Sequence, residues 1–423
     1  MKRDFATTFL TEGVVVICYL LAFRLVADRL GVSGFGEYAL SRRTLAVLMP
    51  LGALSLDVAV ARYIAYALAE GSERWKRYAP AGIALVAGAA IVLSAALLLF
   101  RDAFAELFFG SPRYADLITP MPLLLLGGGL HGIAYGYLRG RSRIQLANVL
   151  YGLNQAAVPL LAIVLAQGSV SSILFLMGGG WILCSLAFLA LSRLSFAGMS
   201  TSVAELARYG FPRLPGDLLR LGLFSVPGIV VAHVADVAVA GGVAFGVAAV
   251  GMLGSALSPI GFVMLPVAAR MMAAGDIGDL RRRVMNIAVL TAAALLAGIV
   301  VVEVFAAQIV SLYLGPGFTS TADSLRVIAP AALPWGIYTS LASVIDAHHV
   351  QPVNARNIAI SCGVFAVGAI TAMVLHAPAT AVAAAFVVSL YILGALTLFE
   401  VHTITSRRAD VATPLAQESQ PLL

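Results

Sequence analysis

The chain has 423 residues, of which 61% are hydrophobic and only 11% are charged, and its mean hydropathy is +0.95. Soluble domains carry about 25% charged residues, so this composition excludes a soluble globular protein and indicates a polytopic membrane protein. The formal net charge of +6 does not indicate a nucleic-acid partner, because most basic residues lie in short segments between apolar stretches. Basic residues in such segments are typical of charges that set membrane topology.

Apolar stretches of about 20 residues, each long enough to cross a bilayer core of about 30 Å, recur along the whole chain. The first stretch is interrupted by Glu12, Arg24 and Asp28 and has no small-residue cleavage site, so we expect a retained helix and not a signal peptide. The sequence therefore predicts an all-α fold with about 12 transmembrane helices. They are expected near 9–30, 43–68, 80–100, 117–138, 147–166, 171–193, 209–233, 237–266, 285–313, 325–348, 356–376 and 379–400.

The helices divide into two similar halves. Three matches recur at an offset of about 205 residues, which indicates an internal repeat: 73–77 with 279–283, Gly110 with Gly315, and Gln145-x-x-Asn148 with Gln351-x-x-Asn354. Two six-helix repeats share one orientation, and a site between them is expected. The predicted organisation is an N-terminal lobe at 1–194, a cytoplasmic linker at 195–208, a C-terminal lobe at 209–405 and a disordered cytoplasmic tail at 406–423.

The connecting segments on one side of the predicted bundle carry most of the lysine and arginine residues, including Lys2 and Arg3 near the N-terminus. Because basic loops stay in the cytoplasm, both termini are expected there. On this topology Arg42 and Arg43 lie in the outer turn between the first two predicted helices.

Four arginines fall inside predicted membrane helices: Arg24, Arg62, Arg213 and Arg220. A charged residue near the middle of a membrane helix costs roughly 2.5–3.5 kcal/mol, so such residues usually face the bundle interior or a wet cavity. At 1.5 Å per residue the four form a ladder, with Arg62 and Arg213 near the inner face, Arg220 near the midplane and Arg24 in the outer third. The segment 209–228 contains three prolines and four glycines, which predicts a bent or broken helix.

Two interpretations of these charges stay open from the residues alone. They could be internal ion pairs, Arg24 with Asp28 and Asp217 with its two neighbouring arginines. Alternatively the guanidinium groups, which offer a planar fork suited to phosphate oxygens, line a basic cavity for an anionic substrate. In that case the carboxylates are candidates for counter-charges or for a proton or sodium site: Glu12, Asp57 and Asp217.

Other signals exclude more than they indicate. The three cysteines and six histidines have no metal-ligand spacing, so no metal site is expected. Neither of the two lysines lies in a P-loop motif, which argues against ATP hydrolysis by this chain. We expect no cofactor beyond a coupling cation, H⁺ or Na⁺.

Five short motifs of glycine, tyrosine, arginine and small apolar residues are spread over both halves. They are Gly31-x-x-Gly34-Phe35-Gly36-Glu37-Tyr38-Ala39, Leu51-Gly52, Ala61-Arg62-Tyr63-Ile64-Ala65, Tyr137-Leu138-Arg139-Gly140 and Tyr209-Gly210-Phe211-Pro212. With these motifs, most of residues 5–400 resembles the polysaccharide transporters, or lipid-linked oligosaccharide flippases, of the multidrug/oligosaccharidyl-lipid/polysaccharide exporter superfamily.

This resemblance implies two six-helix lobes around a central cavity that alternates between the two sides of a bacterial inner membrane. The implied activity is not enzymatic: such proteins flip prenyl-diphosphate-linked oligosaccharides to the outer leaflet for surface polysaccharide assembly, beside membrane lipid and in some cases a polysaccharide polymerase. Carried onto this chain, the cationic cavity comprises Arg24, Arg62, Arg213 and Arg220. The chain lacks the helix pair that longer members carry after residue 400, so a lipid groove built from extra helices is not expected.

Two alternatives remain. A multidrug antiporter of the same superfamily would need carboxylates and aromatic residues in its cavity to bind organic cations, whereas the opening helices here carry arginines. An integral-membrane glycosyltransferase or polymerase would need a sizeable outer segment with catalytic acids, whereas the outer segments here are short.

Overall fold

The structure is a computed structural model that describes residues 2–166, 168–192, 194–349 and 351–406. These residues form helices and connecting turns, with no strand among them, which confirms the predicted all-α class. Ser406 ends the last described helix, and the rest of the predicted tail, 407–423, lies outside the described residues.

Eleven helical segments in the described part of the chain are long and apolar enough to cross a membrane. The first of them, Thr7–Ala69, contains a residue with non-helical backbone at Gly31 (φ 65°). The chain reverses at Gly31, as shown by the ring of Phe23, which lies 5.5 Å from the rings of both Phe35 and Tyr38 on the other side of this residue. This segment therefore holds two predicted spans, and the eleven segments agree with about 12 membrane crossings.

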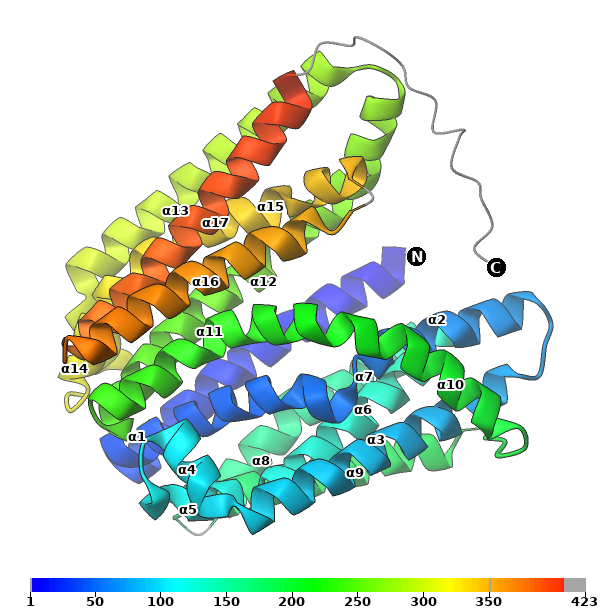
Figure 1. The fold of residues 1–423 in the computed structure, drawn as a ribbon, viewed down its shortest axis with the longest axis horizontal. Helices are drawn as coiled ribbons and strands as arrows, with labels where there is room; N and C mark the ends of the chain where they lie inside the picture. The colour runs from blue at the N-terminus through cyan, green and yellow to red at the C-terminus, as the bar shows by residue number, and fades with distance from the viewer. Residues whose placement is uncertain (1, 167, 193, 350, 407–423) are drawn as a thin grey trace.

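The first half of the chain folds into one group of helices, drawn in blue through cyan to blue-green in Figure 1. Gly31 divides its long first helix into two antiparallel limbs, 2–30 and 32–53. The elements of this half are α1 (Lys2–Ala53), α2 (Leu56–Ala69), α3 (Trp75–Leu99), α4 (Arg101–Phe109), η1 (Pro112–Tyr114), α5 (Ala115–Ile118), α6 (Met121–Gly140), α7 (Ile144–Gly152), the π-helical turn η2 (Leu153–Ala157), α8 (Val158–Leu165) and α9 (Val170–Ala190).

The second half forms another group, drawn in green to red. Its first two helices, α10 and α11, lie along both groups: α10 packs against α2 and α3, and α11 packs against α1, α12 and α16. The segment 195–208, expected as a linker, thus contains most of α10. The elements are α10 (Met199–Gly210), η3 (Phe211–Arg213), α11 (Leu214–Val234), α12 (Val237–Ala273), α13 (Ile277–Tyr313), α14 (Thr319–Ile328), η4 (Ala329–Ala331), α15 (Ala332–His348), α16 (Val353–Val374) and α17 (Ala379–Ser406).

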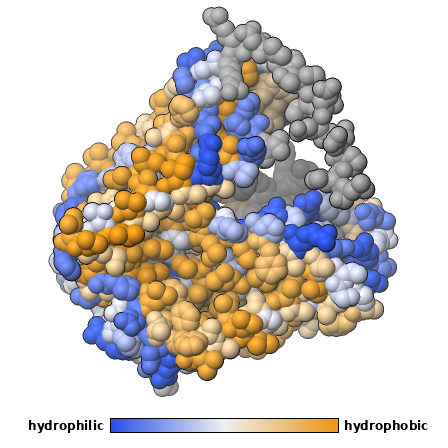
Figure 2. All heavy atoms as spheres, in the orientation of Figure 1, coloured by the Kyte–Doolittle hydropathy of each residue, from blue (hydrophilic) through white to orange (hydrophobic). Residues whose placement is uncertain are grey.

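The two groups diverge like the arms of a V (Figure 1). The arms meet at the end that carries the turns at Gly31, Gly110, Asp236 and Gly315, which we name the closed end. They separate at the other end, where α2 and α12 finish, which we name the open end. Figure 2 shows apolar residues over the broad middle of the visible face and hydrophilic residues gathered mainly at the two ends, as a membrane protein requires.

The hydrophobic core follows the same division. One cluster of buried side chains at the closed end takes Phe23 and Phe35 from the first half and Phe245 and Phe318 from the second. Toward the open end there are two further clusters, one of first-half residues that also takes Leu206 of α10, and one within the second half. Apart from α10, which packs on the first half, the halves share their apolar core at the closed end, which leaves space for a site between them.

Candidate functional site between the two halves

A cavity of about 480 Å³ lies between the halves. Its walls come from the first half through Tyr19 and Arg43 of α1, and from the second half through α11, α12 and α15, with Arg220, Trp335 and Tyr338 among them. Pockets of about 300–1,000 Å³ are typical of small-molecule sites. The charged residues that line this cavity in the described part of the chain are both arginines, so its electrostatic potential favours an anion.

Arg220 reaches this cavity because of the way α11 begins. The predicted break is present: α10 gives way to the short 3₁₀ turn η3, which contains Pro212, before α11 starts at Leu214. Arg220 stands one turn and a half into α11, with a guanidinium nitrogen 4.0 Å from the nearer carboxylate oxygen of Asp217. Because the Arg220 side chain is 56% exposed, this long ion pair leaves most of its donors available to a ligand.

The structure places Arg43 inside the bundle, so the prediction that Arg43 lies with Arg42 in an outer turn is wrong. The second limb of α1 is helical from residue 32 onward, so both arginines stand about three turns inside the bundle. Arg42 turns into the first half, where it donates to the sulfur of Met177 (3.3 Å), whereas Arg43 lines the cavity. The signal in the sequence was Gly31, the one helix-breaking residue needed to begin the second helix eleven residues earlier.

Arg62 and Arg213 come together near the open end. The guanidinium carbon of Arg62 lies 5.1 Å from the centre of the Tyr209 ring, and that of Arg213 lies 3.6 Å from the same ring. Both arginines are exposed. One tyrosine ring thus contacts both cations, and together they can receive an anion with two charged groups.

Arg24 lies apart from both the central cavity and the pair formed by Arg62 and Arg213. It stands at the closed end, where its guanidinium pairs with Asp28 (2.9 Å) and donates to the backbone oxygens of Leu312 (3.1 Å) and Tyr313. Tyr313 returns a hydrogen bond to the Leu20 oxygen, at 2.5 Å. The side chain of Arg24 therefore joins the first half to α13 of the second.

The three predicted carboxylates occupy different places. Asp217 accepts a hydrogen bond of 2.6 Å from Ser55, across the two halves. Asp57 lies in the first turn of α2, against α6, and is half-buried. Glu12 is exposed on the first limb of α1, where it accepts a hydrogen bond from Tyr151 at 3.3 Å. The arrangement brings Asp57 near Ser55 and Asp217 and leaves Glu12 on the neighbouring wall of the first half.

The backbone beside Asp57 is unusual. Leu54 and Ser55 both have φ of 53°, a left-handed conformation that L side chains rarely adopt, and they separate α1 from α2. Such a conformation costs roughly 1–2 kcal/mol per non-glycine residue. Gly210 of α10 fits closely here, since a Cβ at this position would lie 2.4 Å from the Leu54 oxygen.

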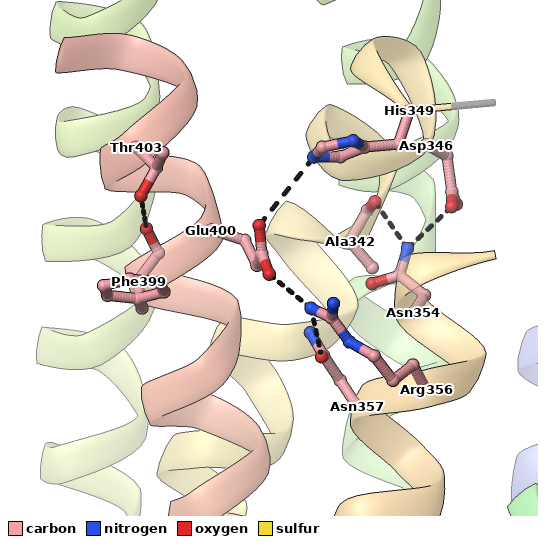
Figure 3. A network of polar contacts seen from close by, with 9 residues as sticks. All are labelled: Ala342, Asp346, His349, Asn354, Arg356, Asn357, Phe399, Glu400 and Thr403. Carbon is pink, nitrogen blue, oxygen red and sulfur yellow. Dashed lines mark hydrogen bonds and ion pairs between the residues drawn. The ribbon is translucent and has the colours of Figure 1, made fainter. Parts of the chain in front are cut away.

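A separate polar network closes the second half near the open end (Figure 3). Glu400 of α17 accepts a hydrogen bond of 2.5 Å from Arg356 of α16 and lies 3.8 Å from a ring nitrogen of His349. Asn354 donates to Asp346 (2.7 Å) and to the oxygen of Ala342 (2.9 Å), both in α15. The network ties α15, α16 and α17 together, and the ion pair of Arg356 with Glu400 at 2.5 Å is much closer than that of Arg220 with Asp217 at 4.0 Å.

Among the described residues, no group of three or more histidine, cysteine, aspartate or glutamate side chains could hold a metal ion. The chemical capacity of the site therefore rests on its arginines, its aromatic residues and the three carboxylates.

No protein-family model matches the chain, and no curated protein matches its sequence. Among solved structures, it is similar to the lipid II flippase MurJ in an inward closed conformation, with 14% identity, a TM-score of 0.73, and 96% of this chain and 90% of that chain covered. It is also similar to an inward-facing multidrug resistance MATE family transporter of the MOP superfamily, with 13% identity, a TM-score of 0.70, and 93% and 96% covered.

A third similar structure is a MOP superfamily transporter from Pyrococcus furiosus, described as having a binding pocket of reverse polarity. The identity is 13%, the TM-score is 0.62, and 96% of each chain is covered. The chain thus has the fold of the multidrug/oligosaccharidyl-lipid/polysaccharide exporters, which confirms the predicted resemblance at the level of the fold. It is a multi-pass membrane protein whose structural neighbours are flippases and transporters.

Proposed function

We propose that this protein is a flippase that moves a prenyl-diphosphate-linked oligosaccharide from the cytoplasmic to the outer leaflet of a bacterial inner membrane, for surface polysaccharide assembly. The observation that carries the proposal is the cavity between the halves, in which Arg43 and Arg220 face the same space from opposite walls. A diphosphate offers several anionic oxygens, and two guanidinium groups can bind them through charge-assisted hydrogen bonds.

The sign of the charge favours this substrate over an organic cation. A drug cation would need carboxylates in the cavity wall, but none of the lining residues in the described part of the chain is acidic. Asp217, the partner of Arg220 at 4.0 Å, also accepts a hydrogen bond from Ser55. The likeness to a flippase named for lipid II supports a lipid-linked substrate. A multidrug antiporter remains the alternative function, since transporters of that class share the fold.

The proposed path begins at the open end, taken as the cytoplasmic side on which the sequence places both termini. The diphosphate first meets Arg62 and Arg213 beside Tyr209, and then moves to Arg220 and Arg43. Its prenyl chain stays in the membrane lipid. The lobes 1–194 and 209–405 then rock, the open end closes, and the closed end separates to release the oligosaccharide toward a polysaccharide polymerase.

The carboxylates supply the coupling in this proposal. Asp217 bridges Ser55 and Arg220, so protonation of Asp217, or a cation bound there, would loosen both contacts at once. Asp57 and Glu12 lie on the first-half wall and act as counter-charges or as part of a proton or sodium site. A proton or sodium gradient would then drive the return of the empty transporter.

The test is deletion of the gene in its host, followed by measurement of prenyl-diphosphate-linked oligosaccharide and surface polysaccharide. We expect the lipid-linked unit to accumulate and the surface polymer to disappear. Complementation with Arg220→Ala should fail, Arg220→Lys should restore part of the polymer because lysine keeps the charge but loses the fork, and Arg282→Ala should restore all of it. Arg282 is the matched control, because it is exposed (78%) and pairs with Asp279 of its own helix.

Two outcomes would overturn the proposal. Unchanged polysaccharide together with raised sensitivity to cationic drugs would favour the antiporter. Full complementation by Arg220→Ala, with the protein present in the membrane, would remove the central cavity from the mechanism.

A further inference from the structure

A second cavity lies in the first half alone, away from the space between the halves. It has a volume of about 660 Å³ and sits at the closed end, between the start of the second limb of α1, the segment 113–117 and the start of α9. All of its lining residues belong to the first half, so rocking of the halves would not dismantle it. We name it the end pocket.

The wall from α1 comes from both sides of the reversal at Gly31. Leu30 ends the first limb, whereas Ser33, Gly34 and Glu37 lie in the first two turns of the second limb, where Ser33 and Glu37 are four residues apart and share one face. Gly34 is buried, and a Cβ there would lie 2.3 Å from the Cβ of Leu30, so the glycine lets the two limbs of α1 approach each other closely. The half-buried Glu37 accepts a hydrogen bond from Ser33. This face therefore presents a carboxylate that a neighbouring hydroxyl holds in place.

The opposite walls add hydroxyl groups and another carboxylate. Asp116 lies in α5, and its backbone oxygen accepts a hydrogen bond of 2.9 Å from Ser171, which fixes this segment to α9. Ser169 caps the N-terminus of α9 and lies 2.8 Å from the hydroxyl of Ser172. Carboxylates accept only, whereas serine hydroxyls both donate and accept. The end pocket thus offers a mixed set of donors and acceptors.

Two aromatic side chains, Tyr114 and Phe175, complete the lining. Arg113 lies over the Tyr114 ring, with its guanidinium carbon 4.7 Å from the ring centre, and donates to the Tyr114 hydroxyl at 2.6 Å. Its charge is therefore partly engaged with its neighbour. With Glu37 and Asp116 the lining carries two carboxylates and one guanidinium, a balance opposite to that of the arginine-lined central cavity.

We propose that the end pocket binds a neutral, polyhydroxylated ligand, a sugar of one or two rings. Neighbouring sugar hydroxyls both donate and accept, so they match carboxylates beside serines, and the apolar face of a sugar ring packs against an aromatic side chain. The net negative lining disfavours phosphate and other anions. The volume lies within the range of about 300–1,000 Å³ that small-ligand sites occupy. The inference goes beyond the proposed transport function, because it concerns free sugar and no translocation.

The test is calorimetric titration of the full-length protein with glucose, galactose and N-acetylglucosamine, in a detergent that has no sugar headgroup. We expect at least one of these sugars to bind. Asp116→Asn and Tyr114→Ala, made singly, should each weaken its affinity at least tenfold. Asp102→Asn and Tyr391→Ala serve as matched controls, because Asp102 is an exposed acid in nearby α4 and Tyr391 is an exposed aromatic residue on α17. Both should bind as the unaltered protein does.

The outcomes separate this inference from its rivals. Binding of tetraphenylphosphonium in place of every sugar would overturn it in favour of an organic cation. Absence of any sugar binding, or equal weakening by the control variants, would overturn it as well. Arg220→Ala should leave sugar binding unchanged, so failure of the end pocket and failure of the proposed flippase activity are distinguishable.

Discussion

The closed end and the central cavity are both contacts between the halves, but they are built from opposite materials. At the closed end, Phe23, Phe35 and Phe245 bring their rings within 5.8 Å of one another, and the halves share one core. In the cavity, Arg43 and Arg220 face each other's half across open space. Apolar surfaces attract without a ligand, whereas two cations repel until an anion lies between them. We therefore infer that a bound anion can hold the halves together in the cavity, where shared apolar contacts do not.

The largest effect should come from removing Arg43, which lines the proposed anion site from the first half. Arg43→Ala removes a charge-assisted interaction of about 1.5–3 kcal/mol, so transport of the lipid-linked oligosaccharide should fall roughly 10- to 100-fold. Accumulation of that intermediate in the complemented deletion strain measures the loss. Arg42→Ala is the matched control, because Arg42 does not line the cavity: its guanidinium donates to Met177 and lies 5.7 Å from the centre of the Tyr19 ring. Equal loss in both variants would contradict the assignment of the cavity wall.

A change at the closed end should act on conformation and not on substrate contacts. A Cβ at Gly36 would lie 2.3 Å from the Val237 oxygen, so Gly36→Ala forces α1 and α12 apart. Overpacking of this kind costs about 1–3 kcal/mol. We therefore expect a shift toward states in which this end is separated.

Maleimide labelling of a cysteine introduced at Phe318 measures that shift, after the three native cysteines are replaced. Phe318 is only 4% exposed and lies 5.1 Å from Phe35, ring centre to ring centre. Labelling should be faster with Gly36→Ala and unchanged with Gly13→Ala, since nothing lies within 4 Å of a Cβ at Gly13. Unchanged labelling in Gly36→Ala would mean that the contact between α1 and α12 at the closed end does not hold the halves together.

A smaller effect is expected from Arg24→Ala, and it tests a role that the sequence alone assigned to substrate binding. At the closed end, Arg24 of the first half donates to the backbone oxygens of Leu312 and Tyr313 in the second half. Because its side chain is 36% exposed, we expect a loss of only about 1 kcal/mol from the contact. Phe318 labelling should rise modestly while the central arginines keep their substrate affinity. Loss of substrate binding with unchanged labelling would return Arg24 to the cationic cavity.

Much of this fold follows from the sequence, because a membrane leaves few options. Apolar length predicts the crossings, and the prolines and glycines of 209–228 predict the break before α11. The site is harder, since the start of the second helix decides which arginines are inside. Gly31 alone ends the first limb, so a boundary placed at residue 43 moved Arg43 out of the cavity. Contacts between the halves, such as those of Arg24, depend on how the halves pack together, and no local sequence pattern predicts that packing.

The smallest effect is expected at Ser55, which combines a hydrogen bond between the halves with a strained backbone. Its hydroxyl joins the halves by a bond of 2.6 Å to Asp217, and its own backbone is left-handed. Ser55→Ala removes the bond, worth about 1 kcal/mol, and keeps the backbone cost. Ser55→Gly removes both, because glycine adopts this conformation freely. The two substitutions therefore separate the hydrogen bond from the backbone.

Spin labels on cysteines replacing Glu73 and Arg282, exposed residues near the open end of each half, report the distance between the halves. If the hydrogen bond restrains them, both Ser55 variants should broaden the distance distribution toward longer values, by about a fivefold change in populations for 1 kcal/mol. If the backbone break is the restraint, Ser55→Ala should leave the distribution unchanged and only Ser55→Gly should alter it. The first result would make Asp217 a contact between the halves as well as the partner of Arg220. A proton or a cation at Asp217 would then weaken the contact between the halves and free Arg220 for the diphosphate in a single step.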